Sequence, residues 1–123
     1  MSTIIATTLS NGSVSVPTAT VVNGSAKAWV NLNGAGTIAV RDSFNVASLT
    51  DLGAGQYQAN FSSAMSAANY AAPLSAEPAD NTGGIPYNGV HAVSSTSVAA
   101  RTTTVSAFSD SALVVISVFG DLA

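Results

Sequence analysis

The hexapeptide Gln56-Tyr57-Gln58-Ala59-Asn60-Phe61 places polar amides at every even position and apolar side chains at every odd position. This period of two is typical of a β-strand with one buried and one exposed face. The segment Gly53-Ala54-Gly55 precedes it and favours a tight turn, because glycine adopts positive φ without strain. We therefore predict a half-buried strand over residues 56–61, entered through a turn.

Other segments show related patterns. In residues 26–33 the small or apolar side chains Ala28, Val30 and Leu32 share one face. Two further strands are predicted at Val90 to Ser94 and Thr102 to Phe108. The segment Leu113 to Phe119 is apolar on both faces. It fits either a central core strand or a strand with the core on one side and a subunit interface on the other.

Many short strands separated by turn signals predict an all-β protein, an antiparallel β-sandwich of jelly-roll or Ig-like type. The strongest helix signal lies at Ser62 to Asn69 and predicts at most one turn or a loop. We divide the chain into an N-terminal extension, residues 1–22, and a β-sandwich module, residues 23–123. Residues 76–89 are rich in proline and glycine, which predicts a long exposed loop.

Composition limits the partners. The chain has 123 residues, of which 47% are hydrophobic and 7% charged, against roughly 25% charged in ordinary domains. Such a surface is weakly protected against self-association, which favours an oligomer. A net charge of −3 and only three basic residues argue against a nucleic-acid partner. The apolar run Ala112 to Phe119 is too short to span a bilayer, so we expect no membrane insertion.

Candidate catalytic groups are few. The chain has a single histidine, His91, and no Gly-x-Ser-x-Gly motif that would supply a hydrolase nucleophile beside it. We interpret His91 as a strand or loop histidine. Glu77 and Asp80 form the one close acidic pair with appeal for glycoside hydrolysis or cation binding, and solvated loop charges explain them more simply. The chain has no cysteine, which excludes a disulfide, a thiolate metal site and a cysteine nucleophile. From these observations together we predict no enzyme activity, no cofactor and no metal.

Aromatic side chains suggest contact surfaces instead. Tyr87, in the loop beside Asn88, and Trp29, on the polar face of its strand, suit either a sugar-stacking platform or an interface. We take Trp29, Glu77, Asp80, Tyr87 and Asn88 as candidate receptor or interface contacts.

One stretch has a specific resemblance. The sequence Asn23-Gly24-Ser25-Ala26-Lys27-Ala28-Trp29-Val30-Asn31-Leu32-Asn33-Gly34 resembles a module of tail-fibre and related virion proteins of tailed phages, especially of marine bacteria. The similarity continues through Gly36 to Val46, Leu49 to Phe61, Ala64-Met65 and Ala68-Asn69-Tyr70, and ends at Val118-Phe119-Gly120. It covers residues 20–123.

The resemblance implies a β-rich homotrimer located in the virion, a short tail or head fibre that contributes to host-surface attachment. Its partners would be further copies of the chain, other capsid or tail proteins and a host surface glycan. A capsid decoration protein and a carbohydrate-binding adhesin module are the alternatives. In either virion protein, residues 1–22 would be a docking arm, since Thr3 to Leu9 and Val14 to Val22 are rich in β-branched residues that can add strands to a partner.

Overall fold

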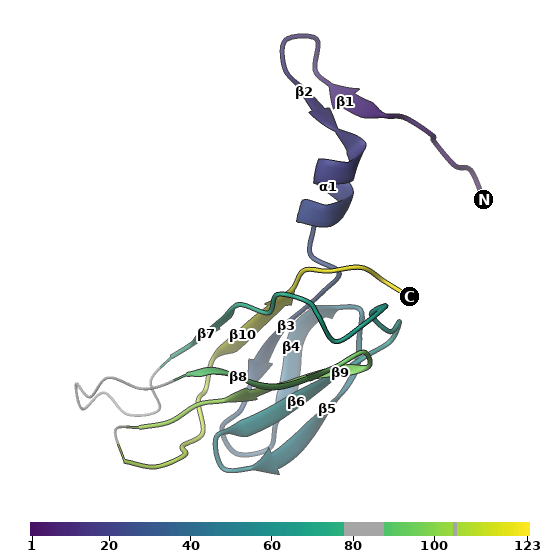
Figure 1. Cartoon of the computed structure of the whole chain (residues 1–123). Helices are drawn as coiled ribbons and strands as arrows, with labels where there is room; N and C mark the ends of the chain where they lie inside the picture. The colour runs from purple at the N-terminus through teal and green to yellow at the C-terminus, as the bar shows by residue number, and fades with distance from the viewer. Residues whose placement is uncertain (78–87, 105) are drawn as a thin grey trace.

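The computed structural model describes residues 1–77, 88–104 and 106–123. In these residues the chain forms short strands and one seven-residue helix (Figure 1). Their order is β1 (Thr8–Ser10), β2 (Ser15–Pro17), α1 (Thr18–Gly24), β3 (Ala28–Asn33), β4 (Ala39–Phe44), β5 (Val46–Gly53), β6 (Gln56–Phe61), β7 (Leu74–Ala76), β8 (Gly89–Ser94), β9 (Ser97–Arg101) and β10 (Val114–Val118).

Two four-stranded sheets form the body, with strand orders β4-β3-β10-β7 and β5-β6-β9-β8, and β1 pairs with β2 in a separate hairpin. All these pairs are antiparallel, so the predicted all-β antiparallel class is confirmed. With β3 to β10 lettered A to H, the sheets run B-A-H-E and C-D-G-F. This order differs from the ABED and CFG sheets of an immunoglobulin constant domain.

One apolar cluster joins the two sheets. It draws alternate residues from β3, β10, β6 and β9, together with Met65. Ala28, Val30 and Leu32 are buried on β3, as the sequence pattern predicts, and the predicted strand 56–61 matches β6 residue for residue. Because each sheet supplies one face to the same core, the sheets form two layers (Figure 1).

The C-terminal strand β10 lies in the middle of its sheet, between β3 and β7. Val114, Ile116 and Val118 enter the core, whereas Val115 and Ser117 are half-buried on the outer face. The strand therefore has the core on one side only, and its second apolar face belongs to the outer surface of the sheet.

One local prediction is wrong. The strand predicted at Thr102 to Phe108 lies earlier, at Ser97–Arg101, and the chain then turns back on itself: the Thr104 amide donates to the Ala107 carbonyl at 2.8 Å. Of the two structures predicted for residues 62–69, one helical turn or a loop, the loop is confirmed. There the amides of Met65 and Ser66 donate to the carbonyls of Ser95 and Asp121, both at 2.7 Å, so long-range partners replace the helical ones.

The helix α1 lies in a segment whose β-branched residues predicted a strand. Only Ser15–Pro17 is extended, and the helix begins at Thr18, directly after Pro17. Its C-terminal carbonyls meet a cation, because the Lys27 ammonium donates to the Val22 and Ser25 carbonyls. A positive charge at this end of a helix complements its dipole.

Asn45 makes the corner where the chain passes from β4 in one sheet to β5 in the other. Its φ is +56°, and it is the one residue other than glycine with positive φ among those described. The side-chain amide donates to the carbonyls of Lys27 and Ser63, both at 3.0 Å, and its oxygen accepts the Ser63 amide at 2.7 Å. Asparagine therefore suits both the left-handed backbone and the three bonds that tie the sheets together.

Tyr70 closes the core at the same end of the body. Its ring meets Phe61 edge-to-face, with ring centroids 5.9 Å apart, and its hydroxyl donates to the Ser97 carbonyl at 2.7 Å. Burial raises the pKa of the Tyr70 hydroxyl above its ordinary 10.0, and the backbone of Ser94 opposes this more weakly.

We expect Asn45→Ala to lower the free energy of unfolding by about 2 to 4 kcal/mol, because three hydrogen bonds are lost and alanine must hold positive φ. Asn45→Gly loses the same bonds without the backbone strain and should be about 1 kcal/mol more stable than the alanine variant. Urea denaturation at neutral pH measures both. A loss below about 0.5 kcal/mol for Asn45→Ala would refute this role for the corner.

The raised pKa of Tyr70 predicts a stability loss in alkali. The folded state favours the neutral phenol, so this contribution is fully present below pH 10 and is lost as the pH rises through the folded-state pKa. Denaturation of the wild type and Tyr70→Phe at several pH values from 8 to 11.5 measures it. The stability difference between the two proteins should shrink above pH 10, and a constant difference would contradict the prediction.

Candidate functional site

The body has two unlike ends. The N-terminal arm, which includes most of α1, joins the body beside the start of β3. The chain connections at the opposite end gather around residues 110–113 (Figure 1). The Gly34 amide donates to the Ser111 carbonyl at 2.9 Å, the Gly55 amide to Asp110 Oδ1 at 2.7 Å, and the Glu77 amide to the Leu113 carbonyl at 2.9 Å. Residues 110–113 therefore hold three chain connections in place. We call this end of the body the loop end.

Tyr57 anchors the loop end from inside. The side chain is 1% exposed, and its hydroxyl accepts the Ser111 amide at 2.8 Å. The Thr102 hydroxyl, also buried, donates to the Ser109 carbonyl at 2.7 Å and lies 3.4 Å from the Tyr57 hydroxyl. Since buried polar groups need partners, these bonds hold Thr102, Ser109 and Ser111 in one arrangement.

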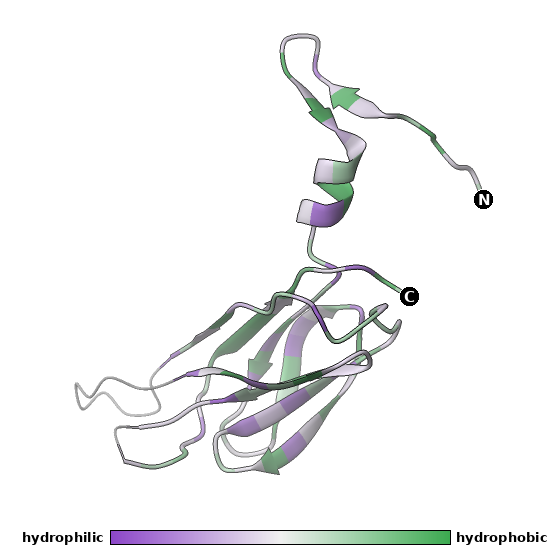
Figure 2. Cartoon of the chain, in the orientation of Figure 1, coloured by the Kyte–Doolittle hydropathy of each residue, from purple (hydrophilic) through white to green (hydrophobic). Residues whose placement is uncertain are grey.

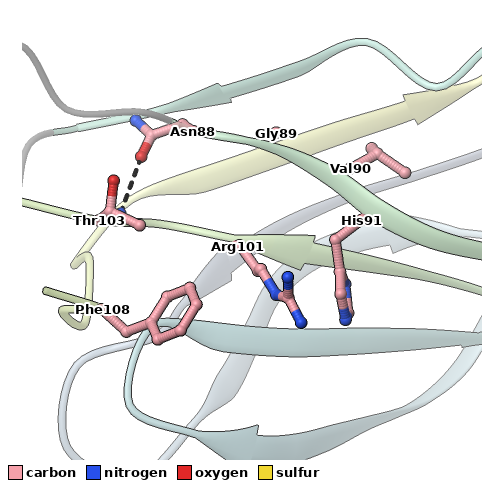
Figure 3. Close-up of a pocket in the computed structure, with 7 residues that line it drawn as sticks. All are labelled: Asn88, Gly89, Val90, His91, Arg101, Thr103 and Phe108. Atoms are coloured by element: carbon pink, nitrogen blue, oxygen red, sulfur yellow. Dashed lines mark hydrogen bonds between the residues drawn. The ribbon is translucent and has the colours of Figure 1, made fainter.

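A shallow hollow of about 300 Å³ opens on the outer side of β8 and β9 at this end. In Figure 3 the Arg101 side chain projects from β9 between the Phe108 ring and the His91 imidazole. The hollow is lined by Asn88, Gly89, Val90, His91, Arg101, Thr103 and Phe108.

One of the predicted contact residues lines this hollow, a second lies elsewhere at the loop end, and two lie outside the described residues. Asn88 lines it, with its amide oxygen accepting the Thr103 amide at 3.3 Å and its nitrogen 3.5 Å from the Ala76 carbonyl. Glu77 is exposed at the end of β7. Asp80 and Tyr87 lie outside the described residues, as does most of the predicted loop 76–89.

Trp29 lies elsewhere, on the outer face of the other sheet. It is half-buried and pairs with Phe44 on β4 and with Ser117 on β10. Ser117, the partner of Trp29, and Leu113, the backbone partner of Glu77, are four residues apart in and just before β10. This corresponds to about 13 Å of extended chain. The structure therefore does not bring Trp29 together with Glu77 and Asn88.

Phe44 extends this surface, because the side chain is 54% exposed directly opposite Trp29. Residues paired in this way hold their Cβ atoms within about 5.5 Å. Phe44 was not among the predicted contacts, since the sequence does not reveal which residue pairs with Trp29. We call Trp29, Phe44 and Val115 the aromatic face.

The sequence analysis also missed the members of the hollow that carry chemistry: Arg101, His91 and Phe108. They come from β9, from β8 and from a turn that the sequence predicted as a strand. A register irregularity contributes, because Val90 pairs with Ala100 and Ala92 with Ala99, which leaves His91 as an extra residue. Such a bulge redirects a side chain, and period-two patterning does not predict it.

Among the described residues, no group of three or more histidine, cysteine or acidic side chains is close enough to hold a metal ion. The described helix is too short to cross a membrane. Comparisons of the chain with models of protein families, with curated proteins and with solved structures find no significant match.

Proposed function

We propose that this chain is a structural protein of a phage virion, a short tail or head fibre without enzyme activity that contributes to host-surface attachment. In this proposal the body is a β-sandwich module of a homotrimer, and the N-terminal arm docks on another virion protein of the capsid or tail. The resemblance of residues 20–123 to fibre modules supports it. The observation that carries it is the opposition of an exposed apolar arm to the loop end.

The arm has the properties of a segment that needs a partner. None of residues 1–24 is buried, and the isoleucines Ile4 and Ile5 are 91% and 93% exposed. Figure 2 shows apolar residues along the arm, which stands away from the body. An isolated two-stranded hairpin and a seven-residue helix are marginal in water by themselves. A partner surface that covers these side chains would stabilise the arm.

The aromatic face suits contact between copies. Trp29 and Phe44 meet on adjacent strands, and Val115 continues the surface on β10. Burial of exposed aromatic area is a large favourable contribution at interfaces. With only 7% charged residues in the chain, few charges oppose close approach of a second copy. The proposal therefore places the aromatic face in the contact between copies.

The solution mass tests the assembly. We expect about 37 kDa by light scattering, three times the 12.2 kDa of the chain, with the mass stable on dilution. Phe44→Asp should convert the trimer to monomer, because the interface would bury an unpaired charge. Thr50→Asp, on an exposed position of β5 in the other sheet, is the matched control and should remain trimeric.

A monomeric wild type would contradict the fibre assembly. It would favour the alternatives, a decoration protein that orders on the capsid or a monomeric carbohydrate-binding adhesin. Equal effects of Phe44→Asp and Thr50→Asp would instead show that the aromatic face is not the contact between copies.

Limited proteolysis tests the arm. Thermolysin, which cuts before large apolar residues, should remove residues 1–21 from the purified chain within minutes, since Ile4, Leu9 and Val22 are exposed. The body should resist, because its core includes no residue of the arm. In intact virions the arm should be protected. Arms cut equally fast in virions and in free protein would contradict the docking role.

A further inference from the structure

The hollow at the loop end contains one positively charged side chain, that of Arg101. It is one of three basic residues in a chain of net charge −3, and none of the described residues that line the hollow is acidic. Its Nε is buried and has no hydrogen-bond partner among the described residues. The protein covers this nitrogen, whereas the two terminal nitrogens of the guanidinium are not among the buried unpartnered atoms. These terminal nitrogens are the donors that an acceptor on a ligand can reach.

Neighbouring side chains define the place of the guanidinium. Its central carbon lies 5.3 Å from the centroid of the Phe108 ring, a cation–π distance. On the other side, the His91 imidazole projects into the same hollow (Figure 3). Asn88 has its own partners in the chain, so its amide fixes the wall of the hollow. Two nitrogen-bearing side chains and one aromatic ring remain to meet a ligand.

A row of amides continues from the hollow across the outer face of this sheet. Gln56 pairs with Arg101, and Gln58 pairs with Ala99 on the same face. Gln58 donates to Asn60 at 2.7 Å, and Asn60 donates to the Ser48 and Thr50 hydroxyls at 3.1 and 3.0 Å. These amides offer both donors and acceptors, which sugar hydroxyls require.

We propose that the Arg101 hollow binds the carboxylate of an acidic sugar unit, a uronic acid within a surface polysaccharide. The planar guanidinium fork matches a carboxylate, and His91 supplies a second nitrogen. Phe108, which is 46% exposed beside the guanidinium, offers apolar contact to the sugar ring. The volume of about 300 Å³ is at the small end of ligand sites, which fits one sugar ring. This inference rests on the proposed attachment role and names its ligand class.

Titration calorimetry with tetragalacturonate tests the site. The comparison ligands are the neutral methyl-esterified tetramer and a sulfated oligosaccharide that has no carboxyl group. The wild type should bind the carboxylate form and neither comparison ligand. Arg101→Gln should weaken binding about tenfold or more, because a charge-assisted pair is lost. Phe108→Ala should weaken it severalfold. Arg41→Gln removes the same charge from exposed β4 and should stay within about twofold of wild type.

Equal losses for Arg101→Gln and Arg41→Gln would overturn the site and show general electrostatic attraction. So would failure of the wild type to bind, whereas equal binding of the sulfated oligosaccharide would overturn the carboxylate assignment. Thermal melting of each variant establishes that it is folded. Light scattering on the same samples separates the two proposals, since a trimer that does not bind the saccharide refutes only this site, and a monomer that binds it refutes only the fibre assembly.

Discussion

The packing of Tyr57 between the two sheets is the constraint on which the rest of the structure depends. Its partner on β9 is the small Ala100, and the Tyr57 side chain is 1% exposed. Its hydroxyl reaches the loop end and accepts the Ser111 amide. Gly34 must lack a side chain, because a Cβ there would overlap the Tyr57 ring. The packing of Tyr57 in the core therefore also fixes the position of the connections at the loop end.

The same constraint explains how the hollow is held. The connection from β9 to β10 is attached to the buried tyrosine through Thr102 and Ser111, and the Thr102 hydroxyl also donates to the Ser109 carbonyl. Gly55 approaches this connection so closely that a Cβ would overlap the Thr102 carbonyl and the Ser109 backbone. Phe108 belongs to this supported connection, so its ring has a defined place beside Arg101. A binding site on such a support needs little ordering when its ligand arrives.

The two ends of the body differ in the kind of stability they have. At the loop end, buried tyrosine, threonine and serine bonds hold the connections, whereas the arm at the opposite end buries none of its own residues. Exposed apolar side chains on a marginal hairpin gain most from a partner surface. A supported loop end opposite an exposed apolar arm is the arrangement that the proposed attachment role requires.

The sequence by itself determined the all-β class and the faces of β3 and β6, because burial on one side of a strand leaves a period of two in the residues themselves. It also placed the turn before β6, where glycines at 53 and 55 adopt positive φ. Only the tertiary structure decided the position of β9, the absence of a helix at residues 62–69 and the opposition of Trp29 to Phe44. In each of these places the deciding partner is distant in the chain, as with the Met65 amide and the Ser95 carbonyl. Arg101, His91 and Phe108 meet for the same reason, since strand register and a bulge bring them together and neither is encoded in local periodicity.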